Sequence, residues 1–138
     1  MKEIIDQVSL RAIEQYGDSF TQEYYRRLKE RTFCTTRCQE CGEMWYPPKP
    51  FCPKCYCEKV AWVELSGKGK LYAFTQQERS LRFSKPDVIG LVELDEDIGR
   101  ILTRIEAKFE ELEIGMEMKV SFIDISNELT LHQFVPVK

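Results

Sequence analysis

The sequence predicts a mostly β protein of 138 residues, with two N-terminal helices, a cysteine-rich metal-binding segment and a C-terminal five-stranded barrel. Three observations support this fold class. Apolar residues recur at helical spacing near the N-terminus, all six cysteines lie between Cys34 and Cys57, and apolar and polar residues alternate in the second half. We therefore expect helices at 1–31, a metal-binding segment at 32–63 and a barrel at 64–138.

Composition and charge narrow the class of protein. Apolar residues make up 43% of the chain, charged residues 31%, and the net charge is −3, as in ordinary globular proteins. This mild charge gives no general signature of nucleic-acid or membrane binding. No apolar run reaches the roughly 18 residues that a membrane span needs. The start, Met1-Lys2-Glu3-Ile4-Ile5-Asp6, is unlike a signal peptide. We expect a cytoplasmic protein.

Two helices are predicted before residue 32. The first helix carries an apolar stripe, and Gly17 interrupts its pattern. Asp18 or Ser19 caps the second helix. In that helix Phe20, Tyr24 and Leu28 share a face. A helical hairpin cannot bury such a stripe alone. We expect its aromatic side chains to contact a partner protein, with packing on the barrel as the alternative. The stripe of the first helix consists of Ile4, Ile5, Val8, Ala12 and Ile13.

The second half of the chain predicts a barrel. Residues 116–122 alternate strictly between apolar and polar side chains, which is the pattern of a half-buried strand. Five such short strands, joined by turns and one short helical stretch near 109–112, favour a small closed barrel. The predicted strands cover 70–75, 88–94, 98–105, 116–122 and 129–135.

Two cysteine pairs predict a metal centre. Cys38 and Cys41 are separated by two residues, and so are Cys52 and Cys55. This spacing lets both sulfurs of a tight turn face one ion, and two such turns supply the four thiolates of a closed structural zinc site. We therefore predict one zinc per chain. Iron is the alternative, because four thiolates do not by themselves select between the two metals.

Cys34 and Cys57 lie outside the paired spacing. We expect them to be free thiols beside the metal. The alternative is a role in ligand exchange or redox chemistry, which requires a lowered thiol pKa.

The chain from residue 30 to its end resembles the DUF35 family. The resemblance lies in Cys38-Gln39-Glu40-Cys41-Gly42, Tyr46-Pro47-Pro48-Lys49-Pro50, Cys52-Pro53-Lys54-Cys55 and Trp62-Val63-Glu64-Leu65-Ser66-Gly67-Lys68-Gly69. Tyr56 departs from the family, which usually has glycine there. The resemblance implies a rubredoxin-like zinc ribbon followed by an OB-fold. It also implies an accessory subunit that bridges thiolase-superfamily enzymes and helps to hold CoA.

The charge of the barrel discriminates between two functions. Residues 64–89 carry five basic and three acidic side chains and residues 90–138 carry five and eleven, so the barrel has a net charge of −4. A nucleic-acid-binding barrel usually offers a basic groove with stacking aromatics. The negative charge of the barrel therefore favours the main hypothesis, in which this chain is an accessory subunit that binds acyl-CoA and a thiolase-like enzyme. A nucleic-acid-binding module is the alternative. Five basic residues are the candidate contacts for the phosphates of CoA, and an ordinary solvated face is the other interpretation of them. They are Lys68, Lys70, Arg79, Arg82 and Lys85.

An independent catalytic activity is not predicted. His132 is the sole histidine and lies in a predicted strand, where packing is the commoner role. The sequence holds neither a Ser–His–acid arrangement nor a phosphate-binding loop. We expect the partner to supply the catalytic residues.

Overall fold

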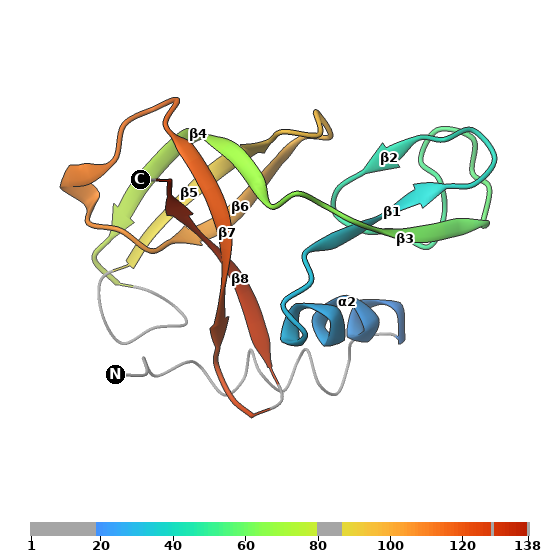
Figure 1. The fold of residues 1–138 in the computed structure, drawn as a ribbon, viewed down its shortest axis with the longest axis horizontal. Coiled ribbons are helices and arrows are strands. Elements are labelled where there is room, and N and C mark those ends of the chain that lie inside the picture. Colours follow the sequence, from blue (N-terminus) through green and yellow to red (C-terminus); the bar gives the residue numbers. More distant parts are fainter. Residues whose placement is uncertain (1–18, 80–86, 128, 138) are drawn as a thin grey trace.

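The computed structural model describes residues 19–79, 87–127 and 129–137. They form one helix, a three-stranded sheet and a closed five-stranded barrel, which confirms the predicted mostly β class (Figure 1). The first predicted helix lies outside the described residues. So does most of the connection between the first two barrel strands, at 80–86. The division into domains at 1–31, 32–63 and 64–138 stays a prediction.

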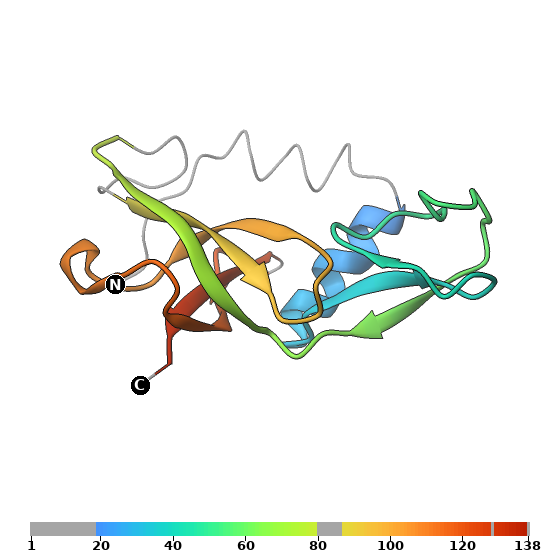
Figure 2. The same ribbon diagram turned by 90° about the horizontal axis from the view of Figure 1, so that it is seen from above.

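Helix α2, Ser19–Lys29, lies alongside the junction of the sheet and the barrel and contacts both (Figures 1 and 2). Leu28 is fully buried, and Tyr24 packs into the same core. Phe20 stacks on Trp62 with ring centroids 4.9 Å apart, and Tyr25 packs against Leu129. These contacts are those of the alternative interpretation, and the contact of the half-buried Phe20 and Tyr25 with a partner stays a prediction. The aromatic side chains pack within the chain, because the helix is held against two layers at once.

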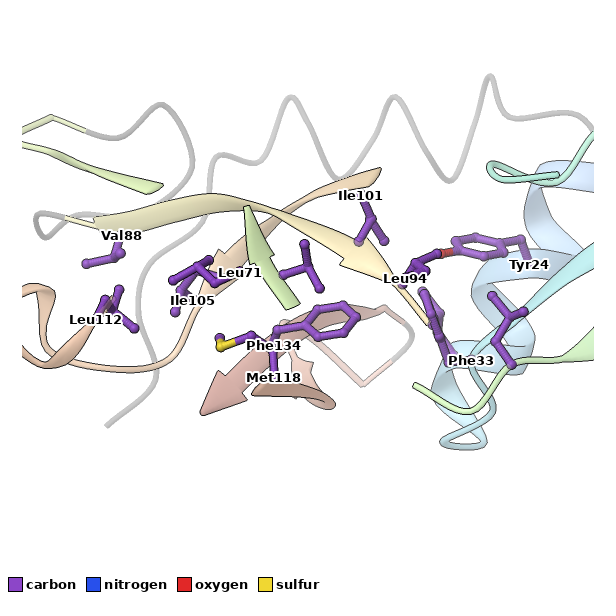
Figure 3. Close-up of a cluster of buried hydrophobic side chains, with 13 residues drawn as sticks. Tyr24, Phe33, Leu71, Val88, Leu94, Ile101, Ile105, Leu112, Met118 and Phe134 are labelled. Carbon is purple, nitrogen blue, oxygen red and sulfur yellow. The ribbon is translucent and has the colours of Figure 1, made fainter. Parts of the chain in front are cut away.

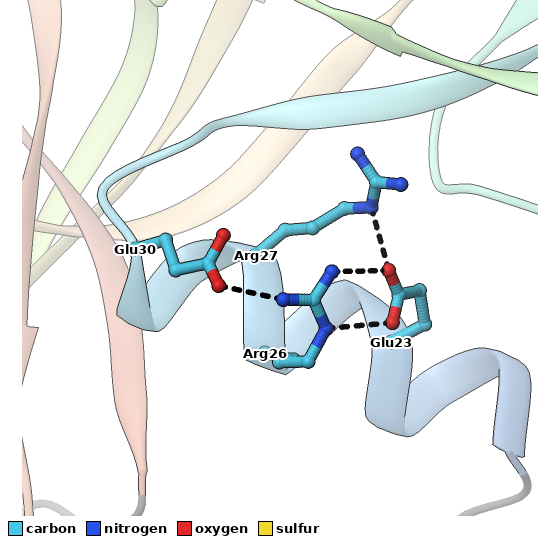
Figure 4. A network of polar contacts seen from close by, with 4 residues as sticks. All are labelled: Glu23, Arg26, Arg27 and Glu30. Atoms are coloured by element: carbon cyan, nitrogen blue, oxygen red, sulfur yellow. Dashed lines mark hydrogen bonds and ion pairs between the residues drawn. The ribbon is translucent and has the colours of Figure 1, made fainter.

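The outer face of α2 carries an ionic network (Figure 4). Arg26 donates to both carboxylate oxygens of Glu23 at 2.7 and 2.8 Å and to Glu30 at 2.6 Å. Arg27 also donates to Glu23, at 3.0 Å. These side chains are between 29% and 59% exposed, so solvent screens the pairs and they contribute little to stability. Beyond the helix, Arg31 makes a two-bond ion pair with Asp124 at 2.9 and 2.8 Å, which ties the helix end to the barrel.

The three-stranded sheet is antiparallel with the order β2-β1-β3. Its strands are β1 (Cys34–Cys38), β2 (Met44–Trp45) and β3 (Val60–Glu64). Thr35 and Thr36 of β1 are fully buried. The Thr35 hydroxyl donates to the carbonyl of Trp45, and that of Thr36 donates to the carbonyl of Lys49 at 3.0 Å. These bonds pair the buried hydroxyls and hold the long connection between β2 and β3 against β1.

The barrel closes through the order β4-β5-β6-β8-β7, with β7 pairing back to β4. Only the β6–β8 pairing is parallel among the strands described. Predicted and observed strands agree to within two residues at each end. The predicted helical stretch is the 3₁₀ turn η1, Phe109–Glu111. The strands are β4 (Lys68–Gln77), β5 (Asp87–Leu94), β6 (Arg100–Ile105), β7 (Glu117–Asp124) and β8 (Thr130–Pro136).

A single apolar core joins the barrel to the helix (Figure 3). Leu71, Met118 and Phe134 fill the barrel with at most 1% of their surface exposed. The core continues through Phe33 to Tyr24, and the rings of Phe33 and Phe134 meet edge to face at 5.9 Å. The barrel therefore supports the helix and the base of the sheet directly.

The chain passes from the sheet to the barrel at Gly67. This glycine has φ +74°, and a Cβ atom there would lie 2.4 Å from Cγ1 of Val120. Only glycine meets both conditions without strain. The carbonyl of Gly67 accepts from the amide of Val120 at 2.6 Å, which closes the barrel just where the chain enters it.

Candidate functional site: a four-cysteine metal centre

The four predicted cysteine ligands converge on one point. Cys38 ends β1, Cys41 follows in the next turn, and Cys52 and Cys55 lie in the connection between β2 and β3. Their four sulfur atoms all lie within 4.8 Å of one another. The Sγ atoms of Cys38 and Cys55 are 3.6 Å apart, as are those of Cys41 and Cys52. A tetrahedral zinc site with Zn–S bonds of about 2.3 Å needs sulfur separations of about 3.8 Å, so the four thiols fit a metal ion.

Both cysteine turns have the same geometry. The Sγ of Cys38 accepts the amide N–H groups of Glu40 and Cys41, each at 3.4 Å. The Sγ of Cys52 accepts those of Lys54 and Cys55, also at 3.4 Å. The amide of Cys41 is the main cause that lowers the pKa of the Cys38 thiol to about 6. The amides therefore favour the thiolate form that a metal requires at Cys38 and Cys52, the first cysteine of each turn. Burial and hydrogen bonds from neighbouring thiols raise the pKa of the Cys41 and Cys55 thiols.

Tyr56 occupies the position in the second turn that Gly42 occupies in the first. Gly42 has φ 78° and donates to the carbonyl of Cys38 at 3.1 Å. Tyr56 has φ 64° and donates to the carbonyl of Cys52 at 2.9 Å. The departure from the usual glycine thus leaves the shape of the second turn intact. It places a tyrosine in a left-handed conformation that a non-glycine residue rarely adopts.

Trp45 shields the metal centre. It is 7% exposed and packs with Cys38 and Cys52, the two buried sulfurs of the set. The neighbouring aromatic residues Tyr46 and Phe51 do not share this role. Tyr46 packs against the main core, and Phe51 is 41% exposed.

Cys34 and Cys57 do not join the four-sulfur group within the described part of the chain. Cys34 is buried in β1, and this burial is the main cause that raises the pKa of its thiol. Cys57 is half-buried, packs beside Cys38 and Cys52, and accepts the amide of Lys59 at 3.3 Å. A raised pKa makes Cys34 a poor redox thiol.

The candidate CoA contacts fall at opposite ends of β4. Lys68 and Lys70 are exposed at its start, and Arg79 is exposed beyond its end. Seven strand residues follow Lys70 before β4 ends at Gln77, a span of about 23 Å, and Arg79 lies beyond that end. Arg82 and Lys85 lie outside the described residues. The structure therefore does not gather these cations into a single patch at the start of β4.

Lys119 is a cation that sequence reasoning missed. It lies directly opposite Lys68 in the β4–β7 pairing, and both side chains are exposed. Like charges placed opposite each other in a sheet are unfavourable unless an anion compensates them. The alternation of β7 already indicates that Lys119 points outward, but the pairing partner of a strand is not readable from its own sequence.

His132 belongs to the interior contacts of the barrel. Its Nδ1 lies 2.9 Å from the hydroxyl of Thr103, and its ring meets Phe33 edge to face at 6.1 Å. This is the packing role that the sequence predicted.

The fold and the site define a class of protein: a four-cysteine ribbon joined to an OB-like barrel. A family model for the C-terminal OB-fold domain of ChsH2 matches residues 62–122. A DUF35 domain-containing scaffold protein of Methanocaldococcus jannaschii is 30% identical over 117 residues, covering 80% of this chain and 82% of that protein. The chain belongs to the DUF35 family.

Two further relatives carry enzyme-complex names. A probable enoyl-CoA hydratase alpha subunit of Thermomonospora curvata is 30% identical over 115 residues. That match covers 82% of this chain but only 36% of the relative, so this chain spans about a third of that protein. The benzoylsuccinyl-CoA thiolase subunit BbsA of Thauera aromatica is 35% identical over 71 residues, covering 51% of this chain and 49% of that subunit.

A solved structure shares most of this architecture. A chain of the Ltp2-ChsH2(DUF35) aldolase superposes with a TM-score of 0.78 and 30% sequence identity, covering 86% of this chain and 95% of that chain.

In the described part of this chain, no helix is both long and apolar enough to cross a membrane.

Proposed function

We propose that this chain is a non-catalytic accessory subunit of a thiolase-superfamily enzyme complex. In this role it holds the catalytic partner and helps to bind the acyl-CoA substrate. The observation that carries the proposal is the match to a chain of the Ltp2-ChsH2(DUF35) aldolase, which extends over ribbon and barrel alike. The relationship to the thiolase subunit BbsA supports the same class of partner.

The metal has a structural role in this proposal. Four thiolates complete the coordination of zinc and leave no open position for a substrate. The ribbon otherwise has only a small apolar cluster, formed by Cys38, Trp45 and Cys52 with Cys57 and Val60 at its edge. One zinc per chain, bound by Cys38, Cys41, Cys52 and Cys55, supplies the stabilisation that this segment lacks.

The chemistry belongs to the partner. His132 is held in the interior contacts of the barrel, and four of the six cysteines face the proposed metal. The nucleophile and the acid–base groups of carbon–carbon bond formation or cleavage then come from the thiolase-type subunit. This chain contributes position: it orders the complex and steadies the CoA moiety.

Cations at the two ends of β4 are the proposed acyl-CoA contacts. Lys68 and Lys70 lie at one end and Arg79 at the other, with Arg82 and Lys85 in the connection that follows. The pairing of Lys68 with Lys119 makes the first end the more cationic one among the described residues. A phosphate bound between the two lysines relieves their repulsion.

Co-expression tests this function. Each thiolase-superfamily protein of the source organism is expressed with and without this chain, and complexes are isolated by size-exclusion chromatography. We expect one of them to co-elute with this chain and to lose most of its activity on acyl-CoA without it. Full activity of every such enzyme in the absence of this chain contradicts the proposal.

A further inference from the structure

The barrel surface carries a hollow of about 390 Å³ between two turns, β5–β6 and η1–β7. Its floor consists of Leu71 and Leu94, which are almost fully buried. Tyr72 and Ile114 stand at its sides with 46% and 64% of their surface exposed. The hollow therefore offers apolar surface to solvent at its walls, through Tyr72 and Ile114.

A β-bulge lies at one wall of the hollow. The register between β4 and β5 shifts between Leu71 and Ala73, so Tyr72 is the extra residue of β4. Tyr72 is exposed as Lys68 and Lys70 are, so it continues the outward-facing alternation of the first half of the strand. Two backbone bonds fix the bulge to the neighbouring turn: Leu71 donates to Met116 at 3.0 Å and accepts from Gly115 at 2.7 Å. These bonds bring Tyr72 and Ile114 to the same hollow.

Tyr72 is held in place although it is exposed. The guanidinium of Arg100 lies 3.5 Å from the centre of the Tyr72 ring, a cation–π contact. Arg100 is positioned in turn by Glu93, which accepts from its Nε at 3.3 Å. Such a fixed aromatic side chain loses little entropy when it is covered by a partner, which is the property of an interface anchor.

The rim of the hollow selects the charge of its occupant. Asp95 and Asp97 are exposed at the rim, and neither makes an ion pair with any residue in the described ranges. Glu93 already neutralises Arg100, which leaves Lys70 as the basic group of the lining. An anionic ligand is disfavoured here, whereas an arginine or lysine can lay its aliphatic stem on Tyr72 and Ile114 and place its charge at the two aspartates.

We propose that this hollow is the docking site for the thiolase-type partner, which inserts an arginine- or lysine-bearing apolar surface segment into it. The inference rests on the proposed function and adds the surface and the chemistry of the contact. Tyr72 and Ile114 are the apolar anchors, and Asp95 and Asp97 steer the basic segment. The start of β4 thus separates two roles, with the partner contact at Tyr72 and the cationic pair at Lys68 and Lys119.

The test uses full-length chain and the enzyme identified by the co-expression experiment. Binding of purified wild type and variants is measured by calorimetry and by stopped-flow association. The double variant Tyr72→Asn, Ile114→Ser is expected to weaken the complex about ten-fold or more. Tyr56→Asn, at a 74% exposed tyrosine on the ribbon, is the matched control and is expected to stay within two-fold of wild type. Thermal melting and zinc content confirm that each variant is folded.

A charge variant separates steering from packing. Asp95→Asn with Asp97→Asn is expected to slow association about three-fold or more and to flatten its dependence on salt, because exposed charges act mainly on the encounter rate. Glu58→Gln on the ribbon is the control and should change neither quantity. Wild-type affinity in both the Tyr72–Ile114 and the Asp95–Asp97 variants overturns the docking site while leaving the proposed function standing. The absence of any complex with wild-type chain overturns both.

Discussion

The hydroxyl groups of Tyr24 and Tyr46 lie 2.5 Å apart and join helix α2 to the segment that follows the β2 strand. Both rings belong to the junction between the ribbon and the barrel core. Burial is the main cause that raises the pKa of each phenol above its ordinary value. The stability of this junction is therefore expected to fall at alkaline pH.

Removing one hydroxyl should destabilise the protein and change its pH dependence. Tyr24→Phe leaves the half-buried Tyr46 hydroxyl without this partner, and we expect a loss of about 1 kcal/mol. In wild type both phenols stay protonated when folded but ionise near pH 10 when unfolded. The unfolded state then binds fewer protons, so stability is complete below pH 10 and falls above it. Urea unfolding from pH 7 to 11 should show a shallower alkaline loss in Tyr24→Phe; an unchanged slope contradicts this linkage.

Metal analysis should find one zinc per chain. Cys52→Ser removes a buried ligand and should lower the zinc content to near zero and unfold the ribbon, since its remaining apolar cluster is small. Cys57→Ser is the matched control: it alters a nearby thiol outside the four-sulfur group and should keep the metal. A coloured preparation containing iron, or a fully folded ribbon in Cys52→Ser, contradicts the assignment.

The Arg104–Asp87 ion pair should matter far more than the network on α2. The Nε of Arg104 donates to Asp87 at 2.8 Å, with side chains only 16% and 6% exposed. Arg104→Leu leaves a buried carboxylate without this cation, and we expect a loss of about 3 kcal/mol in urea unfolding. Arg26→Leu, in the solvent-screened network of Figure 4, should cost much less than Arg104→Leu. Similar losses of unfolding free energy in the two variants would contradict the expectation that burial sets the cost of breaking an ion pair.

Separate charge reversals should locate the acyl-CoA contact. Lys68→Glu alters the cationic end of β4, and Arg79→Glu alters the other end. We expect the variant at the contacting end to raise the KM of the complex for acyl-CoA about five-fold or more with little change in kcat, because the contact is made equally in the ground and transition states. The other variant serves as its control. An unchanged KM in both contradicts a CoA contact at β4.

Nucleic-acid binding should be weak at physiological salt. The barrel carries a net charge of −4, and phosphate neutralisation supplies most non-specific affinity. Fluorescence anisotropy with a labelled single-stranded oligonucleotide should give no saturation at micromolar protein in 150 mM salt, with a basic single-strand-binding protein as positive control. Tight and salt-sensitive binding would restore the nucleic-acid-binding alternative.

Local patterns in the sequence determined much of the fold. The spacing of Cys38, Cys41, Cys52 and Cys55 predicted their convergence, because two residues between cysteines fix the geometry of each turn. Alternation predicted the strand at Met118, since neighbouring side chains of a strand face opposite sides. Both signals act over a few residues and are legible without knowledge of the partner segments.

Only the tertiary structure decided which side chains are exposed to a partner or a ligand. Phe20 and Tyr24 looked available to a partner, yet they pack on Trp62 and Tyr46. Tyr72 looked like an ordinary strand residue, yet the backbone bonds from Leu71 to the turn before β7 place it beside Ile114. The opposition of Lys68 and Lys119 likewise depends on pairing between segments about 50 residues apart in the chain. Register, bulges and pairing arise from long-range contacts, so no local pattern encodes them.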